Sequence, residues 1–562
     1  MPANQRGEPF NRGRFTLLAI TAVVLVYGVV YPSLHLLASS LQFEGRWSLA
    51  NYATIFRQSI VLEAIVSSVG ISLLTVLCCA IVGVPLAFLF ASYRFPGQRL
   101  FSAFAAMPLV LPPLVGTVAF IFLCGESGVL ARVVQRLFGF SSAPWSLRGW
   151  TALIIFHTYT MYPFFYVLTG AGLRRLDAGL AEAGRVLGGA PGHVLRRVIL
   201  PQLTPSLLAA GLLTFMTSMA SFSAPLFFGG GVRVLTLEIF TARQRGDEAL
   251  ALTETVILAA ISLAALIFFQ RYEGTRKFVA AAMKGAPRVR REISSGRTRT
   301  LAIVVGVFFS VLLSLPIFTL VLVSFAVDGQ WTTQTLPPAY TFANYRKVLT
   351  DTDAAGIFLN SLSMSAISAV AALVWSFCVA TIVTSKGWRL GRRLVSLLVL
   401  IPWALPGTVV AISIAEAYGR PSLLLGSYIL VGTFWILPAV YFLRFMPLVV
   451  RAVQSNMEQL DPALEHAAAS LGARWWRRVT RVTLPLVWPG ALAGTLLAFV
   501  IALGEYVASV LIFVPSNRPV SIAIASELRD FNLGSAAAYG VILMVIIAIS
   551  MVVAGRLERL RS

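Results

Sequence analysis

The sequence contains few charged residues. Only 12% of its 562 residues are Asp, Glu, Lys or Arg, whereas 57% are hydrophobic. A soluble globular domain has about 25% charged residues, so this chain lacks the polar surface that a soluble protein of its size needs. The same figures exclude a disordered chain, a collagen and a disulfide scaffold. The remaining class is a polytopic membrane protein.

Cysteine is also scarce, and the sequence has no nucleotide-binding motif. The four cysteines (Cys78, Cys79, Cys124 and Cys378) lie in apolar runs without paired spacing, which indicates neither a disulfide framework nor a zinc site. The pattern G-x-x-x-x-G-K-[ST] and the long polar domain of an ATPase are both missing from the sequence. We therefore expect no catalytic site, no metal and no cofactor in this chain.

Acidic residues are the scarcer of the two charge types. The 45 Lys and Arg outnumber the 23 Asp and Glu, which gives a net charge of +22. In a soluble protein this would suggest nucleic acid, but here the arginines cluster between apolar runs, as in cytoplasmic loops of membrane proteins. We predict a lipid bilayer and no nucleic acid as partner, and three cytoplasmic segments: the N-terminus with Arg6, Arg12 and Arg14, a linker at 271–299 and the tail with Arg556, Arg559 and Arg561. The first apolar run is too long for a cleavable signal peptide.

Twelve apolar runs are long enough to cross a bilayer core, which takes roughly 20 helical residues. They are 16–41, 61–92, 100–124, 150–171, 203–227, 250–270, 300–326, 357–384, 394–416, 424–447, 486–514 and 536–554. The chain thus divides into a first half at 1–270, the basic linker and a second half at 300–562, with six spans in each half.

The two halves repeat each other in sequence. The segment Ser48–Tyr52 (SLANY) returns as Thr341–Tyr345 (TFANY), Pro108–Pro112 returns as Pro402–Pro406, and 176–201 returns as 460–485. The offsets of 293, 294 and 284 residues keep the copies in order. An even number of spans per copy gives both copies the same orientation, so we predict a parallel repeat with a pathway between the halves.

A duplicated loop follows the fourth span of each half, within about 173–202 and about 451–486. The first copy reads Glu182-Ala-Gly-Arg-Val-Leu-Gly188 and the second His466-Ala-Ala-Ala-Ser-Leu-Gly472. In each copy the glycine stands thirteen residues before a proline, Pro201 or Pro485. The pattern predicts a helix–turn–helix whose small residues let another protein approach closely. One such helix could simply lie at the membrane interface; two copies with identical spacing favour a docking function.

These loops resemble the glutamate–alanine–alanine loops of binding-protein-dependent ABC importer permeases. The resemblance covers nearly the whole chain, and the fused form is similar to the ferric-iron and thiamine permeases. It implies an all-α polytopic fold of about twelve transmembrane helices, as two parallel six-helix repeats of the type I importer permease. It also implies docking to an ATPase through a set of loop residues: Glu182, Ala183, Gly188, Pro201, Glu465, His466, Ala467, Ala468, Gly472 and Pro485. His466 occupies the usual glutamate position with Glu465 beside it, so which of the two makes the polar contact stays open.

The resemblance further implies two ATPase subunits that bind ATP and Mg, a periplasmic or lipid-anchored binding protein, and location in the bacterial cytoplasmic membrane with both termini inside. Ferric iron is the first expectation for the substrate, with thiamine, phosphonate, polyamine or an oxyanion as alternatives.

A different class, an ion-coupled secondary transporter, also has twelve spans in two halves. We expect several intramembrane charges in that class, whereas here one carboxylate, Glu505, stands out, with Glu416 near a helix end.

Polar residues within the spans are candidates for the translocation path, because ionisable groups at membrane depth are costly. Glu505 lies in the fifth span of the second half, and Ser221 is its counterpart in the first half. The path is predicted to include Ser221, Ser223, Glu505, Tyr506 and Ser509. For Glu505, a path-lining function and a structural one are left open. For His157 in the fourth span, we favour a packing function.

Overall fold

The computed structural model describes residues 12–176, 178–274, 291–293, 295–331, 334–384, 389–421 and 426–559. Most of the predicted linker 271–299 lies outside these residues, as do Arg6 and Arg561. The regular elements of the described chain are helices, together with two pairs of short strands. β1 (Gln42–Phe43) pairs with β2 (Arg46–Trp47) in an antiparallel hairpin, and β3 (Tyr93–Arg94) pairs in parallel with β4 (Arg291–Glu292).

The first half carries the helices of the first repeat. They are α1 (Arg12–Leu25), α2 (Tyr31–Ser40), α3 (Ala50–Arg57), α4 (Ser59–Ser92), α5 (Gln98–Ala106), α6 (Pro113–Cys124), α7 (Val129–Phe138), α8 (Gly149–Arg175), α9 (Ala178–Val186), α10 (Pro191–Val194), α11 (Leu200–Met219), α12 (Ser223–Phe228), α13 (Leu235–Gln244) and α14 (Glu248–Gly274).

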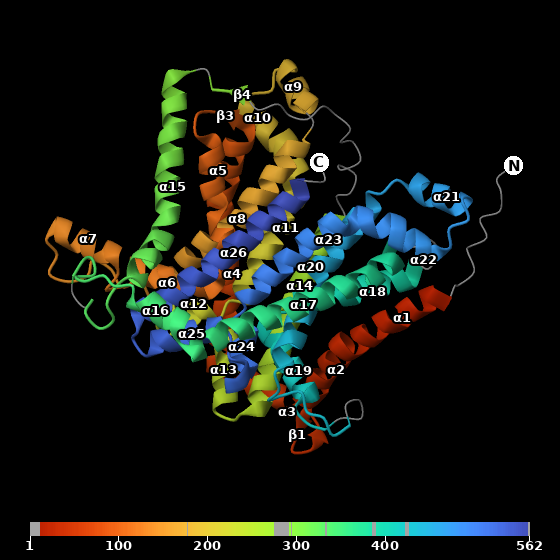
Figure 1. Cartoon of the computed structure of the whole chain (residues 1–562). Coiled ribbons are helices and arrows are strands. Elements are labelled where there is room, and N and C mark those ends of the chain that lie inside the picture. Colours follow the sequence, from red (N-terminus) through yellow and green to blue (C-terminus); the bar gives the residue numbers. More distant parts are fainter. Residues whose placement is uncertain are drawn as a thin grey trace.

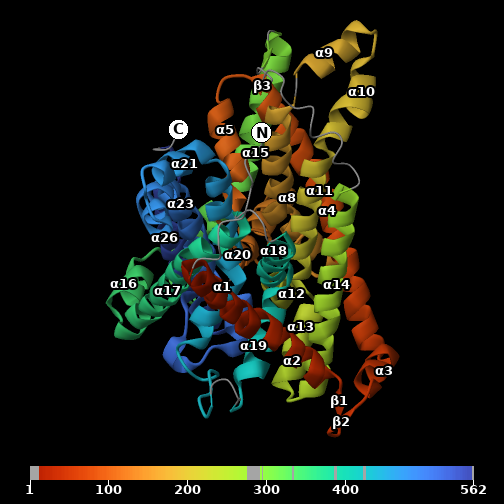
Figure 2. The ribbon, with the colours of Figure 1, turned by 90° about the vertical axis from the view of Figure 1, so that its right-hand side faces the viewer.

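The second half repeats this order. Its helices are α15 (Gly296–Ser324), α16 (Ala343–Thr350), α17 (Thr352–Thr384), α18 (Arg389–Ala404), α19 (Gly407–Tyr418), α20 (Ile436–Glu458), α21 (Pro462–Ser470), α22 (Trp475–Arg478), α23 (Leu484–Leu503), α24 (Val507–Ile512), α25 (Val520–Arg529) and α26 (Leu533–Arg559). Figures 1 and 2 place α9 and α21 toward one end of the molecule, and α3 and α13 toward the other.

The predicted number of spans is confirmed. Among the described residues, eleven helices are long and apolar enough to cross a membrane, and the pair α18–α19, bent by 107°, makes a twelfth if it counts as one span. The fold is therefore an all-α membrane protein built from two parallel six-helix repeats.

Several predicted span boundaries are wrong. The predicted span 424–447 is replaced by α20 (Ile436–Glu458), because Gly426 and Gly432 adopt positive φ angles of +61° and +86° and form turns before the helix. The predicted span 100–124 is interrupted between α5 and α6 at Met107–Pro112, where Pro108 and Pro112 limit regular hydrogen bonding.

The repeated Asn-Tyr motif fastens a short amphipathic helix to the end of each half's first span. In the second half, Asn344 Nδ2 donates to the carbonyls of Ser324 and Ala326 at 2.9 and 2.8 Å, and the Tyr345 hydroxyl lies 2.7 Å from Ser324 Oγ. Asn51 and Tyr52 make the same contacts with Ser40 and Gln42 in the first half. The last carbonyls of a helix lack intrahelical donors, so the asparagine amide satisfies them.

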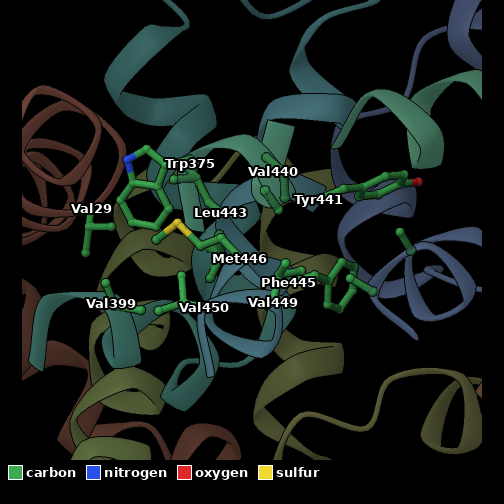
Figure 3. Close-up of a cluster of buried hydrophobic side chains, with 14 of the residues drawn as sticks. Val29, Trp375, Val399, Val440, Tyr441, Leu443, Phe445, Met446, Val449 and Val450 are labelled. Atoms are coloured by element: carbon green, nitrogen blue, oxygen red, sulfur yellow. The ribbon is translucent and has the colours of Figure 1, made fainter. Parts of the chain in front are cut away.

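The first span of each half packs against the other half. α1 contacts α17 and α18, and α15 contacts α5 and α6 as well as α26. Figure 3 shows Val29, which lies in the π-helical turn Val26–Val30 after α1, beside Trp375 and Val399 in the core of the second half. Correspondingly, Ala302 and Leu313 of α15 belong to the core of the first half. The halves are therefore interlocked by their first helices.

Candidate functional site: duplicated loops and an inter-half contact

Both loops contain the same glycine-terminated helix. α9 is followed by Gly188 with φ of +80°, and α21 is followed by Gly472 with φ of +78°. In each loop the glycine amide donates to the carbonyl three residues earlier at 2.9 Å, and the next amide donates to the carbonyl five residues earlier at 3.0 Å. This pair of hydrogen bonds closes the C-terminus of the helix around a residue in the left-handed conformation. Glycine adopts that conformation without strain.

Both loops then continue through one π-helical turn. It spans Leu195–Ile199 in the first copy and Val479–Thr483 in the second, immediately before the helices that carry Pro201 and Pro485 as their second residue. Proline has no amide donor, and isolated π turns occur often at functional sites. The identical glycine-to-proline spacing in the sequence is thus one repeated three-dimensional unit.

The tip of each loop exposes apolar side chains. Val186 and Leu187 are each 87% exposed, and Leu471, the counterpart of Leu187, is 88% exposed. Glu182 and Ala183 are exposed on the same helix, and Gly188 has no atom near the position of a side chain. The surface has the small residues and apolar tip that allow close contact with a partner protein.

The second loop differs in its polar residues. Glu465 Oε1 accepts a hydrogen bond from Thr483 Oγ1 at 3.3 Å, so this carboxylate is directed to the loop itself. His466 and Ala467 are exposed and Ala468 is half-buried. Both side chains left open by the sequence are exposed, and His466 is the one that stands at the repeat position of Glu182.

The fifth span of each half ends in a break at which the two halves meet. α11 ends at Met219 before α12, and α23 ends at Leu503 before α24. The aromatic residues in these breaks, Phe222 and Tyr506, are counterparts in the repeat, and their rings lie 5.9 Å apart. Equivalent residues of a two-fold repeat meet on its axis, so this contact marks the axis between the halves.

The axis is closed around this pair by apolar packing. Phe222 and Tyr506 belong to one buried cluster with Leu111, Leu114 and Val520, which joins both halves. A Cβ atom on Gly504 would lie 2.8 Å from Pro112 of the first half, so the backbones approach closely here. The Tyr506 hydroxyl is buried and has no hydrogen-bond partner in the described part of the chain.

In the first half, serines at the break between α11 and α12 are hydrogen-bonded to a buried histidine. His157 Nε2 lies 2.9 Å from Ser221 Oγ, and His157 Nδ1 lies 3.2 Å from Ser218 Oγ. Ser223 Oγ accepts from Thr117 Oγ1 at 3.2 Å. His157 is 1% exposed and both of its ring nitrogens have partners, which is the environment of a packed residue.

On the second half, the equivalent position holds an ion pair. Glu505 Oε1 lies 2.5 Å from Arg444 Nη1, and the two side chains are only 6% and 17% exposed. Glu505 Oε1 also accepts the amide of Ala508 at 2.9 Å, while Ser509 Oγ donates to the Glu505 carbonyl at 2.8 Å and lies 2.7 Å from the Tyr441 hydroxyl. The carboxylate is thus bound to α20 and to the start of α24.

Two buried charges were missed in the sequence. Arg444 interrupts the apolar run of α20, a signal that was present but lay near the end of the mispredicted span 424–447. Glu254, 1% exposed in α14, contradicts the expectation that Glu505 and Glu416 are the intramembrane carboxylates to consider. Glu254 could have been recognised in the sequence, because it lies within the predicted span 250–270.

Comparison with known proteins gives a consistent result. The family model described as "Binding-protein-dependent transport system inner membrane component" matches residues 83–274 and 373–562. The chain is 29% identical over 548 residues to the probable ABC transporter permease protein y4fN of Sinorhizobium fredii (97% of this chain, 95% of that protein). It is 25% identical to the ferric transport system permease protein FbpB of Actinobacillus pleuropneumoniae (95% and 77%), and 28% identical to the molybdenum transport system permease protein ModB of Mycobacterium tuberculosis (42% and 88%).

The two matched segments lie one in each half of the repeat, and together they cover most of the chain. The relative y4fN aligns from end to end rather than with one half. The chain therefore belongs to the family of binding-protein-dependent transport system inner membrane components, as a fused permease that carries both halves in one polypeptide.

Proposed function

We propose that this permease is the membrane subunit of an ATP-driven importer, in which α9 and α21 each dock one separate ATPase subunit. The observation that carries the proposal is the duplicated loop, with the same glycine cap and the same π turn at equivalent positions. A rigid cap fixes the apolar tip relative to α11 and α23, so displacement of the tip moves the helices that lead to the axis. In this arrangement the chain binds no ATP; the partner subunits bind ATP and Mg.

The first experiment tests docking at Gly188. Gly188→Trp introduces a large side chain at the docking surface and a non-glycine residue at a φ of +80°, which costs about 1–2 kcal/mol locally. We expect the variant to express and fold but to lose ATPase binding and ATP-dependent uptake. Gly188→Asn is the control, because asparagine tolerates the left-handed conformation and is smaller. Gly472→Trp tests the second loop, with a smaller effect expected.

The readouts are co-purification of an ATPase subunit and uptake that vanadate blocks. Normal ATP-dependent uptake by well-expressed Gly188→Trp would contradict docking at this loop. Uptake that follows an ion gradient and resists vanadate would instead support a secondary transporter.

We further propose that the substrate crosses at the Phe222–Tyr506 contact when the halves separate there. Ser221 and Ser223 are the chain neighbours of Phe222, and Glu505 and Ser509 lie at the break and helix start that hold Tyr506. An external binding protein would deliver the substrate to the end of the molecule opposite α9 and α21, and both termini would be cytoplasmic. The basic termini support this orientation, because positive residues favour the cytoplasmic side.

Ferric iron is the substrate we propose. Its support is the match to a ferric transport permease along 95% of this chain, whereas the molybdenum permease matches 42%. The test is uptake of labelled iron, molybdate and thiamine into vesicles that contain the permease with its ATPase and binding protein. Uptake of molybdate or thiamine without uptake of iron would replace this assignment.

A further inference from the structure

An open pocket of about 560 Å³ lies along one face of α18. It is lined by Arg392, Arg393, Ser396, Leu397 and Leu400, which the helical spacing places on one side of the helix. The Nε atom of Arg392 is buried and has no hydrogen-bond partner within the described ranges. A buried donor without an acceptor is costly, so this atom indicates that a ligand oxygen completes the site.

The repeat shows how the same position is filled in the other half. Gln98 stands in α5 where Arg392 stands in α18, and its Nε2 donates to the Phe90 carbonyl at 2.5 Å. Ser102, the counterpart of Ser396, lies 2.7 Å from the Tyr166 hydroxyl. The first half therefore satisfies these groups with its own atoms.

The described residues of the second half offer no equivalent partners. The counterpart of Tyr166 is Val450, a buried residue of the apolar core that offers no hydroxyl to Ser396. A glutamine that bonds the backbone is replaced by an arginine, and a second arginine, Arg393, lines the same pocket. The second half thus presents two cations and a hydroxyl at a pocket that the described residues leave open.

The chemistry of the lining selects the ligand. Guanidinium groups bind phosphate oxygens in charge-assisted hydrogen bonds, and a serine hydroxyl adds a donor. Leu397 and Leu400 follow toward the middle of the bent span, so the lining changes from cationic to apolar along α18. A phospholipid has the same order, with a charged headgroup at the membrane surface and acyl chains below.

We propose that this pocket binds the phosphate headgroup of an anionic phospholipid, with an acyl chain along Leu397 and Leu400. A free phosphate ion shares the polar chemistry but makes no use of the leucines. All five of these lining residues belong to α18 rather than to the docking loops or the Phe222–Tyr506 contact, and the proposal does not depend on which substrate is transported.

The test uses the purified full chain with phosphatidylglycerol, phosphatidylcholine and inorganic phosphate as probes, with bound lipid counted by native mass spectrometry and the thermal midpoint as a second readout. We expect phosphatidylglycerol alone to bind and to raise the midpoint. Removal of two cations in Arg392→Gln with Arg393→Gln should weaken its binding about thirtyfold. Arg99→Gln is the matched control, because Arg99 is the exposed counterpart of Arg393 in α5.

A second variant keeps both charges. Ser396→Phe fills the pocket, and we expect it to displace the lipid while the protein remains folded. Equal binding of phosphatidylglycerol by the parent, the double variant and Ser396→Phe would overturn the proposal. Equal losses in Arg99→Gln and the double variant would also overturn it, since binding would then follow net charge. Binding of inorganic phosphate that the double variant loses would overturn the lipid assignment in favour of a free anion.

Discussion

The pair Arg444–Glu505 makes a prediction that separates a structural function of Glu505 from one in the translocation path. Glu505→Gln removes the negative charge but keeps an oxygen that can accept the Ala508 amide. In the parent, the Glu505 carboxylate lies 2.5 Å from Arg444 Nη1, so the variant leaves the Arg444 cation without a counter-ion. Little else in the local hydrogen bonding has to change.

The expected cost follows from the burial of the two groups. An exposed ion pair contributes about 0–1 kcal/mol, whereas removing one partner of a buried pair costs about 3–5 kcal/mol. Glu505 is 6% and Arg444 17% exposed, so we expect the lower end of the buried range, about 3 kcal/mol for Glu505→Gln. Arg444→Met should cost a similar amount. The double variant carries no unpaired charge, and we expect it to be more stable than either single variant.

The assay is denaturant unfolding of the three variants and the parent in one detergent, with uptake measured at matched protein levels. Additive costs in the double variant, or single variants as stable as the parent, would refute the coupling. Uptake that is lost in Glu505→Gln and returns in the double variant identifies Arg444 as the group through which Glu505 acts. Uptake that is lost in both, in folded protein, assigns the carboxylate to the path.

Further predictions concern the axis and the Asn-Tyr motif. Tyr506→Phe should leave stability unchanged or raise it, because it removes a buried hydroxyl without a partner in the described chain, and a clear loss in thermal unfolding would contradict this. Phe222→Ala should cost about 3–5 kcal/mol by leaving a cavity at the axis, and an unchanged unfolding midpoint would show that the cluster closes without it. Asn344→Ala should lower the free energy of unfolding by about 1–3 kcal/mol, because it leaves two carbonyls without a donor. Asn51→Ala is the matched variant in the first half. An unchanged unfolding free energy in both variants would show that the asparagine does not fasten the short helix.

The sequence predicted the repeated elements of this fold better than the irregular ones. Span number and the halves follow from apolar length and from matching motifs, which need no tertiary information. The glycine cap of the loops was visible as Gly188 and Gly472, since a left-handed residue after a helix strongly favours glycine. The turns at Gly426 and Gly432 were not foreseen, because an apolar run continues through them and hydropathy does not register backbone conformation.

Only one member of the ion pair, Glu505, was predicted from the sequence, because hydropathy did not place Arg444 correctly within its span. Glu505 was recognised as an intramembrane acid, but its partner Arg444 is 61 residues earlier in the sequence. The predicted span 424–447 was also displaced by about half its length from α20 (Ile436–Glu458), so the position of Arg444 within the membrane was misjudged. The contact between Phe222 and Tyr506 depends on how two repeats face each other. No local pattern specifies that relation, so the aromatic pair could be recognised only in three dimensions.

The exchange of first helices has a consequence for how the protein is made. α15 covers α5 and α6, yet it is synthesised about 190 residues after them, when the other helices of the first half have already been synthesised. Conversely, α1 must wait for α17 and α18, the last of which begins at Arg389. Neither half can therefore finish its assembly during synthesis of its own segment. In a fused chain, the surface of each half stays close to the first helix of the other half that covers it. The effective concentration of the two is therefore high, whereas two separate polypeptides would have to meet by diffusion in the membrane.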